Sequence, residues 1–285
     1  MTLFAFLLVF AAAVCHATWN FYVKRINGGP ELIWLFSLVT CILYFPAAFY
    51  VFATVETQWG WVEIGFIVGS SLLHIAYFLC LQAGYRRGDL SLVYPTARST
   101  GPLLSVTFAV IVLGEAISIQ AALGVFIIIA GVINLTGGFK KRSSNLTTSL
   151  LFGISTGVFI GAYTVLDAHA VAVIMIPPLI LDYASISIRL LIMTPIALRR
   201  MELVKGHWRD HCTAVLVVAI ISPLAYILVL YAMTFTPVIY VAPLRESSVV
   251  MTVLMGSIWL GEGDLKHRLS WALVIMGGVA LLATG

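Results

Sequence analysis

Apolar runs of near-membrane length follow one another along almost the whole chain, separated by short polar breaks. An α-helix needs about twenty apolar residues to cross a bilayer. Such runs predict helices, because the strands of a membrane barrel are shorter and alternate in polarity. The sequence therefore predicts an all-α integral membrane protein with ten transmembrane helices. We expect these near residues 2–23, 32–54, 61–84, 90–113, 117–137, 148–168, 174–197, 213–234, 238–260 and 267–284.

Composition supports this class and excludes others. Of the 285 residues, 61% are hydrophobic and only 10% are charged, whereas about a quarter of the residues in soluble domains are charged. The first apolar run lacks a basic start and a small-x-small cleavage site, and it contains His16 and Asn20. We therefore expect a retained helix rather than a signal peptide. The net charge of +4 gives no indication of nucleic-acid binding.

Basic residues gather in the loops that follow odd-numbered helices. They are Lys24, Arg25, Arg86, Arg87, Lys140, Lys141, Arg142, Arg199, Arg200, Lys205, Arg209, Lys266 and Arg268. The segments after even-numbered helices contain acids instead, namely Glu56, Glu115 and Asp167. By the positive-inside rule the basic loops are cytoplasmic and both termini lie outside. We expect a multi-pass protein of the cell (inner) membrane.

The two halves of the chain repeat one unit. Leu81–Glu115 aligns with Leu230–Glu262, so that Arg98 matches Arg245 and the Gly-Glu pair at 114–115 matches the pair at 261–262. A proline lies two or three residues before each arginine. The unit has five helices, and an odd number inserts the second copy upside down. We therefore predict two inverted repeats, residues 1–140 (helices 1–5) and 146–285 (helices 6–10), an arrangement typical of secondary transporters.

This repeat resembles the EamA family of the drug/metabolite transporter superfamily. The resemblance rests on the five-helix halves, the P-x-x-R pattern that opens the fourth helix and the Gly-Glu pair that closes it. It implies a central cavity lined by helices 1, 3, 4, 6, 8 and 9, with helices 5 and 10 outside. It also implies transport of amino acids and related metabolites, with export as the commoner direction in the family.

Ionisable side chains inside the expected helices mark the transport site. Each costs about 2.5–3.5 kcal/mol at the bilayer centre, so it must face an aqueous cavity or a partner. In helix 1 the residues His16, Asn20 and Lys24 recur every four positions beside Trp19 and form one polar stripe. Aromatic rings with a polar tip suit an amphipathic solute. The predicted substrate-binding residues are Trp19, Asn20, Tyr77, Tyr94, Arg98, Tyr163 and Arg245.

Arg98 has two interpretations that the sequence leaves open. Pro95 is expected to kink or unwind the first turn of helix 4, which makes Arg98 a good anchor for a carboxylate or phosphate. Alternatively, Arg98 pairs with Glu246 of another helix in a structural or gating ion pair. Asp182 and Arg189 lie seven residues apart, two turns along one face of helix 7, and pair through water or with neighbouring helices.

Three titratable residues are predicted to couple transport to protons or to gate it: His16, His74 and Glu246. A carboxyl group inside a membrane and a histidine near neutrality are the side chains best able to take up and release a proton.

The predicted function is secondary transport, by alternating access, of small amphipathic metabolites with a carboxylate, such as amino acids. Alternatives are an organic cation or drug transporter with an aromatic cage, and a sugar-phosphate exchanger. An enzyme is not expected, because no nucleophile has a base at motif spacing. No cofactor or metal is expected: His207 and His211 lie in a basic loop, and the four cysteines have no ligand spacing. The expected partners are a small-molecule substrate, the lipid bilayer and protons, and the expected state is a monomer or weak homodimer.

Overall fold

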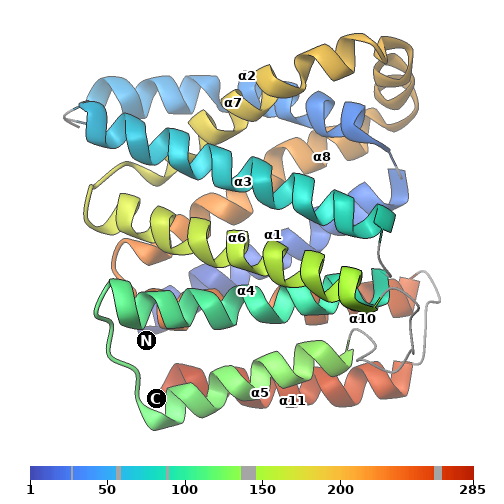
Figure 1. Cartoon of the computed structure of the whole chain (residues 1–285). Helices are drawn as coiled ribbons and strands as arrows, with labels where there is room; N and C mark the ends of the chain where they lie inside the picture. Colours follow the sequence, from blue (N-terminus) through green and yellow to red (C-terminus); the bar gives the residue numbers. More distant parts are fainter. Residues whose placement is uncertain (27, 56–58, 88–89, 136–145, 260–264) are drawn as a thin grey trace.

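The apolar runs fold as helices, and no other regular element occurs in the residues that the computed structural model describes (Figure 1). These are residues 1–26, 28–55, 59–87, 90–135, 146–259 and 265–285. The helices are α1 (Leu3–Ile26), α2 (Pro30–Thr54), α3 (Trp61–Arg87), α4 (Leu90–Val112), α5 (Ile119–Leu135), α6 (Leu146–Ala172), α7 (Pro178–Leu198), α8 (Met201–Met233), α9 (Val238–Leu244), α10 (Ser247–Trp259) and α11 (Leu265–Thr284). The predicted ten-helix membrane fold is confirmed, with the ninth helix in two pieces, α9 and α10.

Six helices in the described part of the chain are long and apolar enough to cross a membrane: α1, α2, α3, α6, α7 and α8. Shorter apolar segments lie in α4, α5 and α11. Prolines set several starts, since α2 and α7 each begin at a proline and Pro237 precedes α9. A proline suits the first turn of a helix because the amide that it lacks has no partner there.

The first part of α8, which was predicted as a loop of some fifteen residues, is helical instead. It runs from Met201 to a bend at His211, whose φ and ψ are −136° and 26°. The residues after the bend correspond to the predicted eighth membrane helix. Its first turns are amphiphilic and largely exposed, which is why hydropathy alone did not identify them.

Helix packing follows the five-helix unit. α1 packs against α8 and α10, and α6 packs against α3 and α4, the equivalent helices of the other half. α2 packs against its own counterpart α7, and α5 against its counterpart α11. α5 and α11 lie side by side along one edge of the bundle (Figure 1), in line with their expected place outside the cavity.

Glycines bring α4 and α6 into close contact. Gly153, Gly157 and Gly161 recur every four residues on the face of α6 that meets α4. A Cβ placed on Gly157 would lie 2.5 Å from the Cβ of Thr100. In membranes such small residues let helix backbones approach and gain van der Waals contact. α4 is therefore sealed against α6 along much of its length.

Both chain ends lie at the same face of the bundle (Figure 1), here called the termini face. α4, α6 and α8 end at this face, and α9 begins there. The opposite face, here called the basic face, has the described cations Arg87, Arg199, Arg200, Lys205 and Lys266 at or near helix ends. Lys140, Lys141 and Arg142 lie outside the described residues.

Candidate substrate site

The ninth transmembrane segment is interrupted at two charged residues. α9 ends at Leu244 and α10 begins at Ser247, so Arg245 and Glu246 occupy the break. Tight turn hydrogen bonds replace the helical ones, with the Glu246 amide donating to the Pro243 carbonyl at 3.0 Å. The chain tightens here without leaving the helical region, since Arg245 has φ and ψ of −56° and −27°. Interrupted membrane helices mark the substrate sites of many transporters.

Glu246 binds Arg98 across the two halves. Its Oε1 lies 3.6 Å from the Nη1 of Arg98, and the two side chains are 7% and 19% exposed. The second oxygen, Oε2, is buried and has no hydrogen-bond partner among the described residues. Of the two interpretations of Arg98, the structure therefore shows the ion pair. α4 is continuous through Pro95, so the expected unwinding of helix 4 is wrong, and the interruption falls in the second copy, after Pro243.

His16 joins this ion pair from α1. Its Nε2 lies 3.4 Å from the Nη2 of Arg98, and its Nδ1 accepts a hydrogen bond of 3.3 Å from the indole of Trp19. A donor group thus faces each ring nitrogen, although a neutral imidazole accepts at only one of them. A protonated His16 accepts at neither, so its charge state controls both contacts.

A second polar cluster surrounds Asp167. This carboxylate is fully buried and accepts a hydrogen bond of 2.5 Å from the hydroxyl of Tyr226 in α8. The Nε2 of His74 in α3 lies 4.0 Å from the same oxygen, Oδ2. The other oxygen, Oδ1, has no hydrogen-bond partner in the described part of the chain. The Arg245 guanidinium lies 5.5 Å from the centre of the Tyr226 ring, which connects this cluster to the helix break.

Aromatic rings line the same region. The imidazole of His74 stacks on Tyr163 with 4.0 Å between ring centres, and Tyr77 meets Tyr163 edge-on at 5.9 Å. The side chain of His74 remains 23% exposed and that of Arg98 19% exposed. Each cluster therefore keeps one partly accessible cationic or imidazole side chain, although the carboxylates themselves are buried.

The predicted site residues fall into three groups. The structure brings Trp19, His16, Arg98 and Glu246 together in one cluster, and Tyr77, Tyr163, His74 and Arg245 in the other. Asn20 is different, because its amide donates to the His16 carbonyl of its own helix at 2.7 Å. Tyr94 lies in α4, but its side chain is outside the described residues.

Asp167 and Tyr226 were missing from the predicted site. The sixth helix was expected to end at residue 168, which placed Asp167 at a membrane surface. α6 instead continues to Ala172, so Asp167 lies more than a turn inside it. The sequence signal for this residue is an aspartate within an apolar run. Extending the sixth helix beyond residue 168 would have placed Asp167 inside the membrane.

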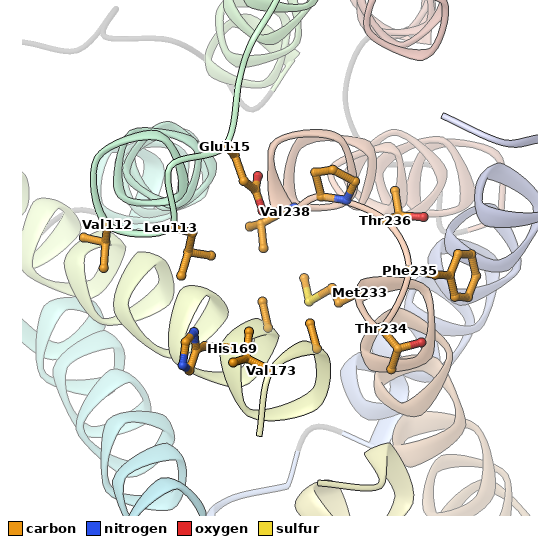
Figure 2. A pocket seen from close by; sticks show the side chains of 13 residues that line it. Val112, Leu113, Glu115, His169, Val173, Met233, Thr234, Phe235, Thr236 and Val238 are labelled. Carbon is orange, nitrogen blue, oxygen red and sulfur yellow. Dashed lines mark hydrogen bonds between the residues drawn. The ribbon is translucent and has the colours of Figure 1, made fainter. Parts of the chain in front are cut away.

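A cavity opens at the termini face (Figure 2). It has a volume of about 400 Å³ and lies between the ends of α4, α6 and α8 and the start of α9. Glu115 lies at its rim and points toward Val238 (Figure 2). The carboxylate of Glu115 accepts hydrogen bonds from the amides of Val238 and Ile239, each at 3.0 Å, and so caps α9.

This contact explains one of the repeated Gly-Glu pairs. Gly114 has a φ of +69°, a conformation that glycine adopts without strain, and it turns the chain so that Glu115 reaches the other half. The equivalent Gly261 and Glu262 lie outside the described residues.

A second, apolar groove lies between α1 and α10. Its volume is about 320 Å³, and it is lined by Val14, Ala17, Thr18, Met251, Leu254, Met255 and Ile258. The equivalent helices of the other half, α4 and α6, are sealed by glycines. The two repeats therefore differ in how closely these helices approach.

No group of three histidine, cysteine, aspartate or glutamate side chains in the described residues is arranged to hold a metal ion. Cys15, Cys41, Cys80 and Cys212 are free thiols.

A multi-pass helical bundle with a broken helix and buried charges at its centre is a membrane transporter in architecture. Comparison with protein families agrees: the model of the EamA-like transporter family matches residues 3–137 and 147–284. The chain belongs to this family, whose members are transporters and not enzymes.

One solved structure, titled only as the crystal structure of a protein, superposes with a TM-score of 0.74. It covers 98% of both chains at 16% sequence identity, which supports the fold alone. No curated protein matches the sequence.

Proposed function

We propose that this transporter carries small zwitterionic metabolites, with amino acids as the main class, and exports them. One observation supports the class above all: guanidinium and carboxylate groups of both signs gather at the helix break. Arg98 and Arg245 lie beside Glu246 and Asp167, and each carboxylate has one oxygen without a partner among the described residues. A polar region with both charges suits a solute that itself has both.

The arrangement disfavours the two alternatives. A sugar phosphate has two negative charges and would need several free cations, but Arg98 already has Glu246 at 3.6 Å. An organic cation would suit the aromatic rings of Tyr77 and Tyr163, yet the guanidinium groups of Arg98 and Arg245 would repel it. We assign the rings of Trp19, Tyr77 and Tyr163 to the apolar part of the substrate.

Alternating access follows from the repeat. In this proposal the halves 1–140 and 146–285 are inverted copies that exchange conformations. The difference between the sealed α4–α6 contact and the groove beside α1 and α10 supports this step, because equivalent helix pairs then occupy two states in one molecule.

Proton coupling belongs to the same proposal, through His16, His74 and Glu246. His16 has a donor at each ring nitrogen, so its protonation repels Arg98 and frees Glu246. We expect uptake into proteoliposomes to follow an imposed pH gradient in the wild type and to lose that dependence in Glu246→Gln. If the rate of uptake by the wild type does not depend on the pH gradient, the proposed proton coupling is refuted.

The test of the substrate class is thermal stability of the purified protein in detergent against the twenty amino acids, simple carboxylates, sugar phosphates and quaternary amines. A ligand that binds only the folded state stabilises it by about 2.7 kcal/mol at a hundred times its dissociation constant. We expect stabilisation by amino acids, followed by their counterflow in proteoliposomes. Stabilisation by sugar phosphates or quaternary amines alone would overturn the proposal.

A further inference from the structure

α7 has a buried pair of opposite charges that neither polar cluster uses. Asp182 is 7% exposed, and its Oδ2 is buried without a hydrogen-bond partner among the described residues. Seven residues further along, the Nε of Arg189 is also buried and without a hydrogen-bond partner in the described part of the chain. Other buried carboxylates differ: Glu31, Asp167 and Glu246 each have a close partner.

The helix sets the distance between the two charges. Seven residues are two turns, so the α carbons lie on one face about 10.5 Å apart. Side chains of a helix lean toward its N-terminus, which directs Arg189 toward Asp182. The two groups lie within electrostatic range of each other, and no hydrogen bond or ion pair between them occurs in the described part of the chain.

This face of α7 borders the proposed substrate region. Ser185, between the two charges, lies 3.2 Å from Ser71 of α3 through the hydroxyl oxygens. Arg189 lies within electrostatic range of Tyr77 and His74, and Asp182 within range of Asp167. The neighbours of the α7 pair therefore include residues that line the polar region, together with Cys41 and Tyr44 of α2.

We infer that Asp182 and Arg189 are the residues that bind the head group of the zwitterion, with its ammonium on Asp182 and its carboxylate on Arg189. The inference rests on the proposed function and assigns its binding pair. A buried charge without a contact partner costs free energy, and in a membrane protein it is retained for a function. The forked guanidinium matches a carboxylate, and a carboxylate accepts the hydrogen bonds of an ammonium group.

The test is isothermal titration calorimetry on the full chain with three ligands that share one side chain. They are the amino acid that stabilises the wild type most, its decarboxylated amine and its deaminated acid. For phenylalanine the last two are phenethylamine and 3-phenylpropanoate. The variants are Asp182→Asn and Arg189→Gln, and the matched controls are Asp210→Asn and Arg209→Gln, an exposed pair outside the polar region.

The expected result is a crossed pattern. Asp182→Asn raises the dissociation constants of the amino acid and the amine about 10- to 100-fold, because one charged hydrogen-bonding partner is removed, and changes that of the acid by less than about twofold. Arg189→Gln weakens the binding of the amino acid and the acid and leaves the binding of the amine unchanged. If either variant does not fold, Asp182→Glu and Arg189→Lys keep the charge, and Arg189→Lys still weakens only the carboxylate-bearing ligands because it loses the fork.

Two results overturn the inference. Either the variants bind the amino acid as tightly as the wild type does, or they bind all three ligands more weakly by the same factor. The second result would show that the pair is structural. A wild type that binds no amino acid would instead refute the proposed function, and this inference with it.

Discussion

Gly124 in α5 offers a direct test of how the two halves meet at the edge of the bundle. A Cβ on this residue would lie 2.7 Å from the carbonyl oxygen of Gly278 and 2.7 Å from the amide nitrogen of Leu282. Both atoms belong to the backbone of α11, so neither can rotate away. The perturbation is the single methyl group of Gly124→Ala.

The magnitude follows from that contact. Non-bonded heavy atoms reach their optimal separation at about 3.5 Å or more, so α5 and α11 must move apart by about 0.8 Å. Overpacking costs about 1–3 kcal/mol, and two backbone contacts at 2.7 Å place this site in the upper part of that range, at about 2–3 kcal/mol. The better helix propensity of alanine offsets up to about 1 kcal/mol. We therefore expect a net loss of about 1–2 kcal/mol, or a fall in Tm of several degrees.

The assay is thermal unfolding of the purified protein in detergent. Gly277→Ala is the matched control, because Gly277 precedes Gly278 in α11 and no atom lies within 4 Å of its added Cβ. We expect the control to keep the wild-type Tm or exceed it slightly. Equal Tm values for the two alanine variants would refute the close approach of α5 and α11. Ligand binding should survive in both, since this edge lies away from the polar region.

Three further predictions use the same measurement. Arg200→Ala should lower the free energy of unfolding by about 1–2 kcal/mol, because it removes the 3.0 Å ion pair of the buried Glu31. The control Lys205→Ala removes an exposed ion pair and should change the free energy of unfolding by under about 0.5 kcal/mol. Gly114→Ala should cost about 1–2 kcal/mol because its φ of +69° strains a residue with a Cβ, although the space around it is open. Trp34→Phe should cost about 0.5–1.5 kcal/mol, because the indole loses a 3.0 Å hydrogen bond to a threonine of α7.

The helices could be predicted from the sequence because bilayer thickness and backbone hydrogen bonding leave few other structures for long apolar runs. The break in the ninth helix could not. Pro95 and Pro243 precede equivalent arginines, yet only the second copy is interrupted. The surroundings of the two copies differ, since α4 is held along α6 by glycines, whereas the break lies among buried residues such as Leu244 and Ser247.

The site could be predicted only in part. Residue type and membrane depth identified Arg98, His16, His74 and Glu246 as the charged centre, because each is costly in lipid. Their pairing depends on which helices are neighbours, and spacing along one helix does not determine this. The partner of Arg98 was therefore open, and Tyr226 had no sequence signal beyond its type.

The cap that Glu115 places on α9 has a consequence for how the chain tolerates mutation. Its hydrogen bonds come from the main-chain amides of positions 238 and 239, so every residue except proline can supply the same donors there. The accepting position has no such freedom, because only a carboxylate side chain supplies two charged oxygens to two adjacent amides. Sequence drift at the start of α9 therefore leaves this junction between the halves intact, while a change at position 115 removes both of its hydrogen bonds at once.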